Sequence, residues 1–540
     1  MQKIKAHPLI TGTLILTFAG MLTRLIGFFY KIYLADLMGT TELGLYQLIF
    51  PVYSLCYTVY AAGIQTALSQ CIAGEKDNPE KIRKYLQGAL FISVGLSLIL
   101  MAALCLFARP VAKHFLLEEI CTNRLRIMSI LFPFCAVSSC LNGYYYGIKK
   151  TGVPALTQLT EQVSRIIFVY GIAMIFLHGQ KEVSCELAVA GLVAGEVIAC
   201  FFMIVCFSVT EKKHLKKRKK SSFSIPDNQV RPAREIKPPY ELKQALSHLC
   251  FIAVPLTGTK LITSILHSAE TILIPGMLKK FGMTAAEALS MYGVLTGMAM
   301  TFLLFPSTIT AAFSILLLPS ISEEEALGNH KKISCLISLS IKYSLLIGFL
   351  FTTLFLLYGP LLGQVFFQNE LCGRFLVILS FLCPLLYLST TLGSILNGLG
   401  RTDYTFISTI ISLGIRIAFV IFAIPKFGIY GYLIGMLISQ LIFTFIQLHL
   451  LNKLATFTFD GLSSLIIPMI LCVISGFAGK LFVGNMLSAS SGFMRLILEG
   501  GTTCVVFLFL CIITKIISLP GKNAQIQNEK EQIPNRKKQK

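Results

Sequence analysis

Four cationic side chains interrupt the long apolar stretches of this sequence. Arg165 and Arg416 each lie roughly 20 Å along their stretch at 1.5 Å per helical residue, near the middle of a bilayer. Arg24 and Lys260 lie on polar stripes whose members recur every three or four residues and therefore share one helix face. An ionisable residue at mid-membrane depth costs about 2.5–3.5 kcal/mol on insertion scales, so it usually faces a cavity. Because arginine forks bind phosphate well, these cations predict a cavity for an anionic substrate.

Two of the cations differ in their acidic neighbours along the chain. Glu161 precedes Arg165 by one helical turn, so the two side chains can pair along the helix. The pair is either a neutralised structural ion pair or a part of the binding site. Ser412 stands at the matching position before Arg416, which is therefore expected to be freer to meet an anion.

Three further ionisable residues could couple transport to an ion. His267 and Glu270 lie one turn apart and could carry a proton or bind a cation, although an interhelical hydrogen bond is the simpler interpretation. Glu196 is isolated near the middle of its apolar stretch. It is either a partner for one of the cations or a coupling-ion site, and the sequence does not choose between them.

The two polar stripes also contain small residues and one further lysine. Small residues in membrane helices usually allow close helix packing. Lys31, at the end of the first stripe, is expected to extend to the outer interface. The stripes comprise Thr13, Thr17, Gly20, Arg24, Gly27 and Lys31, and Thr257, Lys260, Ser264, His267 and Thr271.

The stretches that carry these residues are long enough to cross a membrane. Hydrophobic residues make up 55% of the 540 residues and charged residues only 14%, whereas soluble domains have about 25% charged residues. Uncharged stretches such as 86–108 and 427–452 exceed the roughly 20 residues that span the hydrocarbon core as a helix. We expect an all-α polytopic membrane protein with about fourteen spans, at 10–35, 44–72, 85–108, 125–148, 155–178, 186–209, 245–277, 284–318, 336–358, 373–398, 404–425, 428–452, 461–484 and 494–518.

The net charge of +21 follows from where the basic residues lie. The segment 210–243 holds eleven lysines and arginines, and the tail after Pro520 holds six. With an even number of spans these segments fall on one side of the membrane, as the positive-inside rule requires for cytoplasmic segments. The distribution predicts a multi-pass protein of the cytoplasmic membrane with both termini in the cytoplasm, and no nucleic-acid partner.

An internal repeat relates the two halves of the chain at an offset of 251 residues. The repeat pairs 133–169 with 384–420, including Pro133 with Pro384 and Arg165 with Arg416. Its parallel topology predicts two pseudo-symmetric six-helix lobes, a known transporter design. The expected parts are an N-lobe at 1–209, a basic cytoplasmic linker at 210–243, a C-lobe at 244–452, two extra helices at 453–518 and a basic cytoplasmic tail at 519–540.

Motifs for enzymes, metals and cofactors do not occur. The sequence has no CxxC, Walker A or HExxH motif, and its sixteen cysteines lie mostly inside apolar stretches as small hydrophobes. No metal, cofactor or catalytic residue is expected. The expected outer loops are short, and the large inner loop is basic and Pro-rich, so a polytopic enzyme of glycan assembly is the less favoured interpretation.

Several stretches resemble the stage V sporulation protein B family, in the polysaccharide-exporter branch of the multidrug/oligosaccharidyl-lipid/polysaccharide (MOP) flippase superfamily, which also includes the multidrug and toxin extrusion (MATE) transporters. The resemblance is carried by "GMLTRLIGFFYKIYLADLMGTTELGLYQLIFPVYSL", "AGIQTALSQCIA" and "LNGYYYGIKKTGVPALTQLTEQVSRI". It implies a two-lobed, V-shaped bundle that flips an undecaprenyl-pyrophosphate-linked sugar to the outer leaflet by alternating access. In spore formers it implies a role in cortex peptidoglycan synthesis.

The resemblance also implies a role for Arg24, which falls where related lipid II flippases carry a cavity arginine in their first helix. Those relatives carry further arginines in helices 2 and 8, whereas the spans 45–72 and 289–318 are uncharged here. This departure puts lipid II itself in doubt as the substrate, but not a lipid-linked glycan in general. The expected partners are this anionic lipid, membrane lipids and a coupling ion, Na⁺ or H⁺, unless membrane potential acts directly. The alternative within the superfamily is a MATE-type exporter of drugs or metabolites, for which an acid-rich cavity is expected.

Overall fold

The computed structural model describes residues 8–75, 78–176, 183–223, 241–457, 461–484, 492–514 and 516. Every regular element in these ranges is a helix, and no strand occurs in them. Residues 224–240 of the predicted basic linker and the whole basic tail at 519–540 lie outside the described residues. The all-α prediction is therefore confirmed for the described part of the chain.

The first two predicted spans form one long helical run. Helix α1 (Pro8–Tyr57) continues through a π-helical turn, η1 (Thr58–Ala62), into α2 (Gly63–Gly74). Within α1, Gly39 has φ of +71°, which separates the predicted spans 10–35 and 44–72. Glycine adopts this left-handed conformation without the steric cost that a Cβ would bring.

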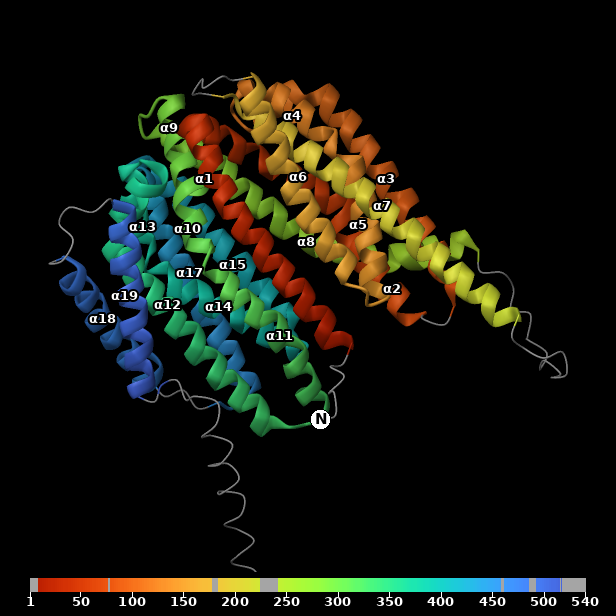
Figure 1. Cartoon of the computed structure of the whole chain (residues 1–540). Helices are drawn as coiled ribbons and strands as arrows, with labels where there is room; N and C mark the ends of the chain where they lie inside the picture. Colours follow the sequence, from red (N-terminus) through yellow and green to blue (C-terminus); the bar gives the residue numbers. More distant parts are fainter. Residues whose placement is uncertain are drawn as a thin grey trace, which may run out of the picture. The chain divides into compact units, whose positions relative to one another are not determined.

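The remaining helices follow the predicted order (Figure 1). Up to the basic linker these are α3 (Pro79–Pro110), η2 (Val111–Phe115), η3 (Glu119–Cys121), α4 (Thr122–Ser129), α5 (Leu131–Gly147), α6 (Gly152–Phe176) and α7 (Cys185–Phe223). After it come α8 (Leu242–Lys280), α9 (Ala285–Gly293), η4 (Val294–Ala299), α10 (Met300–Leu304), α11 (Ser307–Ala326), α12 (His330–Phe367), α13 (Glu370–Leu379), α14 (Leu382–Gly398), α15 (Thr402–Phe422), α16 (Ile424–Phe427), α17 (Ile429–Leu454), η5 (Leu462–Ile466), α18 (Ile467–Gly484) and α19 (Gly492–Ile513).

The number of membrane crossings is bounded by length and hydropathy. Among the described residues, ten helices are long and apolar enough to cross a membrane, or up to twelve if each of two bent helix pairs is one span. One of the ten, Ile15–Gly74, contains the break at Gly39 and covers two predicted spans. The count of fourteen agrees with this arrangement and stays a prediction.

The helix bounds repeat at the predicted offset. Helices α5 and α14 both have 17 residues, and their first residues, Leu131 and Leu382, are 251 positions apart. Each is preceded by a short helix, and the two helices are bent by 45° at α4–α5 and by 57° at α13–α14. Pro133 and Pro384 explain the shared bend, because proline lacks the N–H that would continue the preceding helix.

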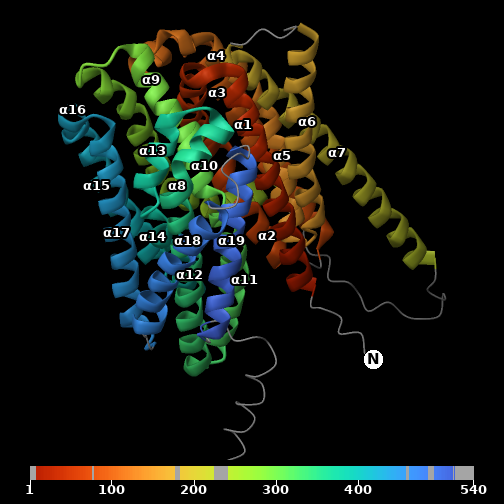
Figure 2. The same ribbon diagram turned by 60° about the vertical axis from the view of Figure 1, so that its left-hand side comes forward.

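Contacts between residues divide the chain into two compact units. One comprises residues 1–319 and 401–439, and the other comprises 320–400 and 440–540. In the second unit α18 and α19 lie side by side (Figure 2) and bury Phe507 and Cys511 against Leu346 of α12. The predicted lobe boundaries at 209, 243, 452 and 518 stay a prediction.

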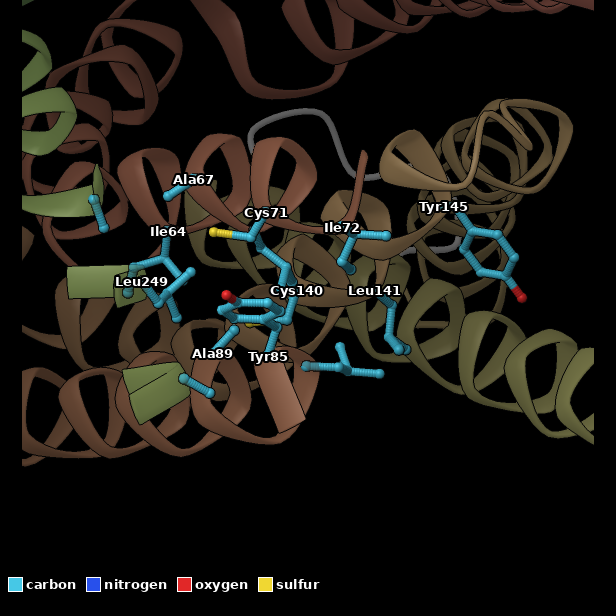
Figure 3. Close-up of a cluster of buried hydrophobic side chains, with 14 of the residues drawn as sticks. Ile64, Ala67, Cys71, Ile72, Tyr85, Ala89, Cys140, Leu141, Tyr145 and Leu249 are labelled. Carbon is cyan, nitrogen blue, oxygen red and sulfur yellow. The ribbon is translucent and has the colours of Figure 1, made fainter. Parts of the chain in front are cut away.

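A buried cluster in the first unit joins helices from both sides of the basic linker. Its members come from α2, α3, α5, α7 and α8, and Figure 3 shows Cys71, Tyr85 and Ala89 close to Leu249. Small side chains such as Ala89 and Cys140 let the helices approach closely. The first helix after the linker, α8, therefore packs on the N-terminal helices along its first turns.

Candidate functional site

A cavity of about 720 Å³ lies within the first unit, lined by both halves of α1, by the α4–α5 bend and by helices α6, α7, α10 and α11. Five acidic or basic side chains line it, and they come from three helices. Three hydroxyl groups, those of Thr301, Ser307 and Thr308, lie on the wall around the break between α10 and α11. The ionisable lining residues are Arg24, Lys31, Glu161, Arg165 and Glu196.

Helix α1 supplies two of the three cations. Arg24 and Lys31 are seven residues apart, which is about two turns, so they share one face of the helix. The ammonium of Lys31 donates to the Thr301 hydroxyl over 3.5 Å. Neither Arg24 nor Lys31 takes part in an ion pair of the described residues. Lys31 lines the cavity, a role that the sequence interpretation did not assign to it.

Helix α6 supplies the third cation together with its own carboxylate. Arg165 and Glu161 form the predicted ion pair one turn apart. Arg165 also donates to the Gln162 side-chain oxygen over 3.3 Å, and only 16% of its side chain is exposed. Its Nε is buried without a hydrogen-bond partner. The pair therefore holds the guanidinium in place on the cavity wall.

Close packing of α6 on α7 brings a second carboxylate to this wall. A Cβ at Gly195 would lie 2.8 Å from the Glu161 carbonyl oxygen and 3.1 Å from the Arg165 Cβ. Only glycine fits there, and Glu196 follows it directly in the chain. The charged lining is thus three cations against two carboxylates, a net charge of one positive unit in the cavity.

Arg416 does not line this cavity, and it is not the freer cation that the sequence led us to expect, because it has an acidic partner on another helix. Its Nε lies 3.1 Å from Oε1 of Glu270, a carboxylate on α8 that is only 2% exposed. The hydroxyl of Tyr432 donates to the same oxygen over 2.8 Å. The partner is distant in the sequence, so the neighbours of Arg416 along α15 gave no indication of it.

His267 lies beside the same carboxylate. Its Nδ1 is 3.6 Å from Oε2 of Glu270, and its side chain is 66% exposed. Oε2 itself is buried and has no hydrogen-bond partner. The predicted pairing of His267 with Glu270 is therefore present, and Arg416 joins it.

Lys260 also lies outside the cavity, where its ammonium donates two hydrogen bonds. Its ammonium donates to the Ala62 carbonyl over 2.7 Å and to the Thr66 hydroxyl over 2.9 Å. Ala62 ends the π-helical turn η1, where the change of hydrogen-bond register leaves carbonyls available to other donors. Lys260 thus links α8 to the second half of the α1–α2 run.

The predicted site residues therefore separate into two groups. Arg24, Arg165, Glu161 and Glu196 meet in the cavity, whereas Lys260, Arg416, His267 and Glu270 do not line it. In the described part of the chain, no group of three or more His, Cys, Asp and Glu side chains could hold a metal ion. The cavity, with its charged lining, is the candidate binding site.

Comparison with known proteins gives the family. The model of the polysaccharide biosynthesis protein family matches residues 9–325. Over 446 residues the chain is 28% identical to stage V sporulation protein B of Bacillus subtilis, covering 82% of this chain and 83% of that protein. Over 427 residues it is 23% identical to the lipid II flippase MurJ of Bacillus subtilis, covering 76% of each.

The fold also matches a solved structure. Lipid II flippase MurJ in an inward closed conformation aligns with a TM-score of 0.68 and 15% identity, over 93% of this chain and 98% of that one. Together with the apolar helices, this fold makes the chain a multi-pass membrane protein. The chain belongs to the polysaccharide biosynthesis protein family.

Proposed function

We propose that this protein is a flippase that moves a polyprenyl-pyrophosphate-linked glycan across the cytoplasmic membrane by alternating access. The observation that carries the proposal is the cavity in which Arg24 and Lys31 stand without an ion-pair partner among the described residues. The likeness to lipid II flippases supports a lipid-linked substrate, and the likeness to stage V sporulation protein B supports a role in sporulation.

The chemistry of such a substrate suits the cavity. A pyrophosphate head cannot enter hydrocarbon unaided, because removing a charge from water is costly without compensating partners. Cationic and hydroxyl groups in the cavity would replace part of its hydration shell, while the polyprenyl tail stays in lipid. Lys31 supplies a positive charge in a chain that lacks charged residues in spans 45–72 and 289–318.

The cavity residues take different parts in this proposal. Arg24 and Lys31 bind the phosphates, since they are the cavity cations outside the described ion pairs. Arg165 is a positioning residue whose charge is largely neutralised by Glu161. Glu196 balances the remaining charge or binds a coupling cation.

The proposal also covers the orientation of the chain in the membrane and the movement of its two lobes. Both termini and the basic segment 210–243 lie in the cytoplasm, as their lysines and arginines indicate. The two six-helix lobes, 1–209 and 244–452, move against each other during the cycle, and Na⁺, H⁺ or membrane potential supplies the driving force. No covalent chemistry is assigned to any residue, so the protein acts as a transporter and not as an enzyme of glycan assembly.

The second candidate is a MATE-type exporter of cationic drugs or metabolites. The observation that favours it is the pair of carboxylates, Glu161 and Glu196, in the cavity. Glu161 is already paired with Arg165, however, so only one carboxylate remains to bind a cation. The excess of positive charge makes this function the less favoured one.

A reconstituted flipping assay separates these functions. Purified protein in proteoliposomes is offered polyprenyl-pyrophosphate disaccharide, the monophosphate analogue, and a fluorescent cationic drug. We expect flipping of the pyrophosphate lipid, slower flipping of the monophosphate, and no drug transport. Drug transport without lipid flipping would replace the proposal with the exporter function.

A further inference from the structure

We propose that His267 and Glu270 form a proton-binding site whose occupancy controls the availability of Arg416. The inference rests on the proposed function, because it links the binding of a proton to the binding of the anionic glycan. The site lies on α8, α15 and the first turns of α17, all within the first compact unit.

The geometry of the Glu270 carboxylate carries the inference. Its Oε1 is occupied by the Arg416 guanidinium at 3.1 Å and by the Tyr432 hydroxyl at 2.8 Å. Its Oε2 is buried, has no hydrogen bond and lies 3.6 Å from Nδ1 of His267. A buried acceptor without a partner is unfavourable, so this carboxylate has an unused place for one donor.

His267 is the group through which a proton can reach that place. The carboxylate is 2% exposed, whereas the imidazole is 66% exposed. A polar ring is stable within an apolar span only where it faces protein or water, and an exposed one therefore faces a watery space. Histidine exchanges protons near neutral pH, which suits a carrier in a living cell.

The other groups around Glu270 do not compete for this proton. Arg416 on α15 keeps its charge at all physiological pH values. Tyr432 on α17 already donates to Oε1, and Tyr292 on α9 is a neutral neighbour. The second half of α1 contributes uncharged groups to the neighbouring residues of α8: the Pro51 carbonyl accepts from Ser268, and Ser54 contacts Ser264.

Proton binding at His267 weakens the attraction between the Glu270 carboxylate and Arg416. The neutral imidazole accepts a proton from hydronium, so an N–H bond forms, an O–H bond breaks and water is left. The new N–H then donates to Oε2. One carboxylate is then shared by two cations, so its attraction for each of them is offset by their mutual repulsion. Arg416 becomes available to an anion, and by linkage an anion that binds Arg416 favours proton uptake by the same factor.

The same geometry disfavours a sodium ion at this place. Hard cations prefer several oxygen ligands, whereas the neighbour of Oε2 is a ring nitrogen. The Arg416 guanidinium already occupies the other oxygen. Among the described residues no cluster of three or more acidic, histidine or cysteine side chains surrounds the carboxylate.

A transport experiment tests the coupling. Proteoliposomes with polyprenyl-pyrophosphate disaccharide are held at steady state with and without a transmembrane difference of one pH unit. One proton per substrate shifts the distribution between leaflets about tenfold, since one pH unit corresponds to about 1.36 kcal/mol. We expect this shift in the wild type and in His248→Gln, and its loss in His267→Gln and Glu270→Gln. His248 is a matched control on the same helix, bonded to Tyr85 at 3.1 Å.

A second measurement does not require flipping. Inorganic pyrophosphate, matched in pH, is added to the purified protein in weak buffer, and proton uptake is recorded. We expect uptake by the wild type and none by His267→Gln. No uptake by the wild type, a pH response retained by His267→Gln, or a response to a Na⁺ gradient in place of pH overturns the proton site. Proton uptake without any flipping supports the proton site and instead contradicts the proposed function.

Discussion

Replacement of Arg416 by methionine tests the buried cluster on α8 and α15 most sharply. The substitution keeps an apolar stem of similar reach and removes the cation that lies 3.1 Å from Glu270. Breaking a buried ion pair by removing one partner costs about 3–5 kcal/mol, because the other charge is left uncompensated. The Tyr432 hydrogen bond remains. Protonating a glutamate of ordinary pKa at pH 7 costs roughly 3.7 kcal/mol, and this cost limits the loss because Glu270 can become neutral once Arg416 is removed. We therefore expect a loss near 3 kcal/mol in the free energy of unfolding.

A double-mutant cycle shows whether this loss comes from the interaction between Arg416 and Glu270. The free energy of unfolding in bicelles is measured for Arg416→Met, for Glu270→Gln and for both together. We expect the double variant to regain most of the loss, leaving a coupling energy of about 2 kcal/mol or more between the two sites. Surface substitutions typically change the free energy of unfolding by less than about 0.5 kcal/mol. If Arg416→Met changes it by no more than this, the guanidinium is not paired with Glu270 and the reasoning is refuted.

Two further predictions concern contacts between helices, and the same unfolding assay measures both. Lys260→Met should cost about 1.5–3 kcal/mol, because it removes a charged donor from the Ala62 carbonyl at 2.7 Å; an unchanged stability would show that this bond contributes nothing. Gly293→Val should cost about 1–3 kcal/mol or more through overpacking, since even a Cβ would lie 3.0 Å from the Gly44 Cα. Gly20→Val is the control, because nothing lies within 4 Å of a Cβ there, and equal losses at the two glycines would contradict the packing argument.

Features that depend on local sequence could be predicted well. Apolar stretches indicate helices because the hydrocarbon core fixes their length and composition. The 251-residue offset could be recognised because residue types such as Pro133 and Pro384 match, and the structure bends a helix pair near each of these prolines. The pairing of Glu161 with Arg165 followed from one helical turn of separation, and the structure contains it.

Features that depend on contacts between distant helices could not be predicted. Glu270 and Arg416 are far apart in the chain, so only the packing of α8 against α15 reveals that they pair. Lys260 was expected to face a cavity, but it donates to a carbonyl in the turn η1, and no sequence pattern predicts this turn. Lys31 shares a face with Arg24, and this spacing was the signal that could have placed it in the cavity.

Irregular helices explain why the number of spans was harder to predict than their existence. Gly39, with φ of +71°, separates two spans within one run that is otherwise continuously helical. The break between α10 and α11 falls at Pro306, where proline interrupts the backbone hydrogen bonds. Hydropathy averages over such breaks, so it detects apolar length and not the points where the chain bends.

The flipping rate of charge variants at the cavity tests the central claim most directly. Arg24→Gln, Lys31→Gln and their combination are compared with the wild type at equal reconstitution, using polyprenyl-pyrophosphate disaccharide. Arg109→Gln is the control, because Arg109 pairs with Glu119 on an exposed surface outside the cavity.

Each cavity cation contributes about 1.5–3 kcal/mol through a charged hydrogen bond to phosphate. We expect a roughly 10- to 150-fold loss of flipping for each single variant. The double variant should lose more, and the control should match the wild type. If the double variant flips the lipid at the wild-type rate, the cationic cavity does not bind the pyrophosphate and the account is contradicted.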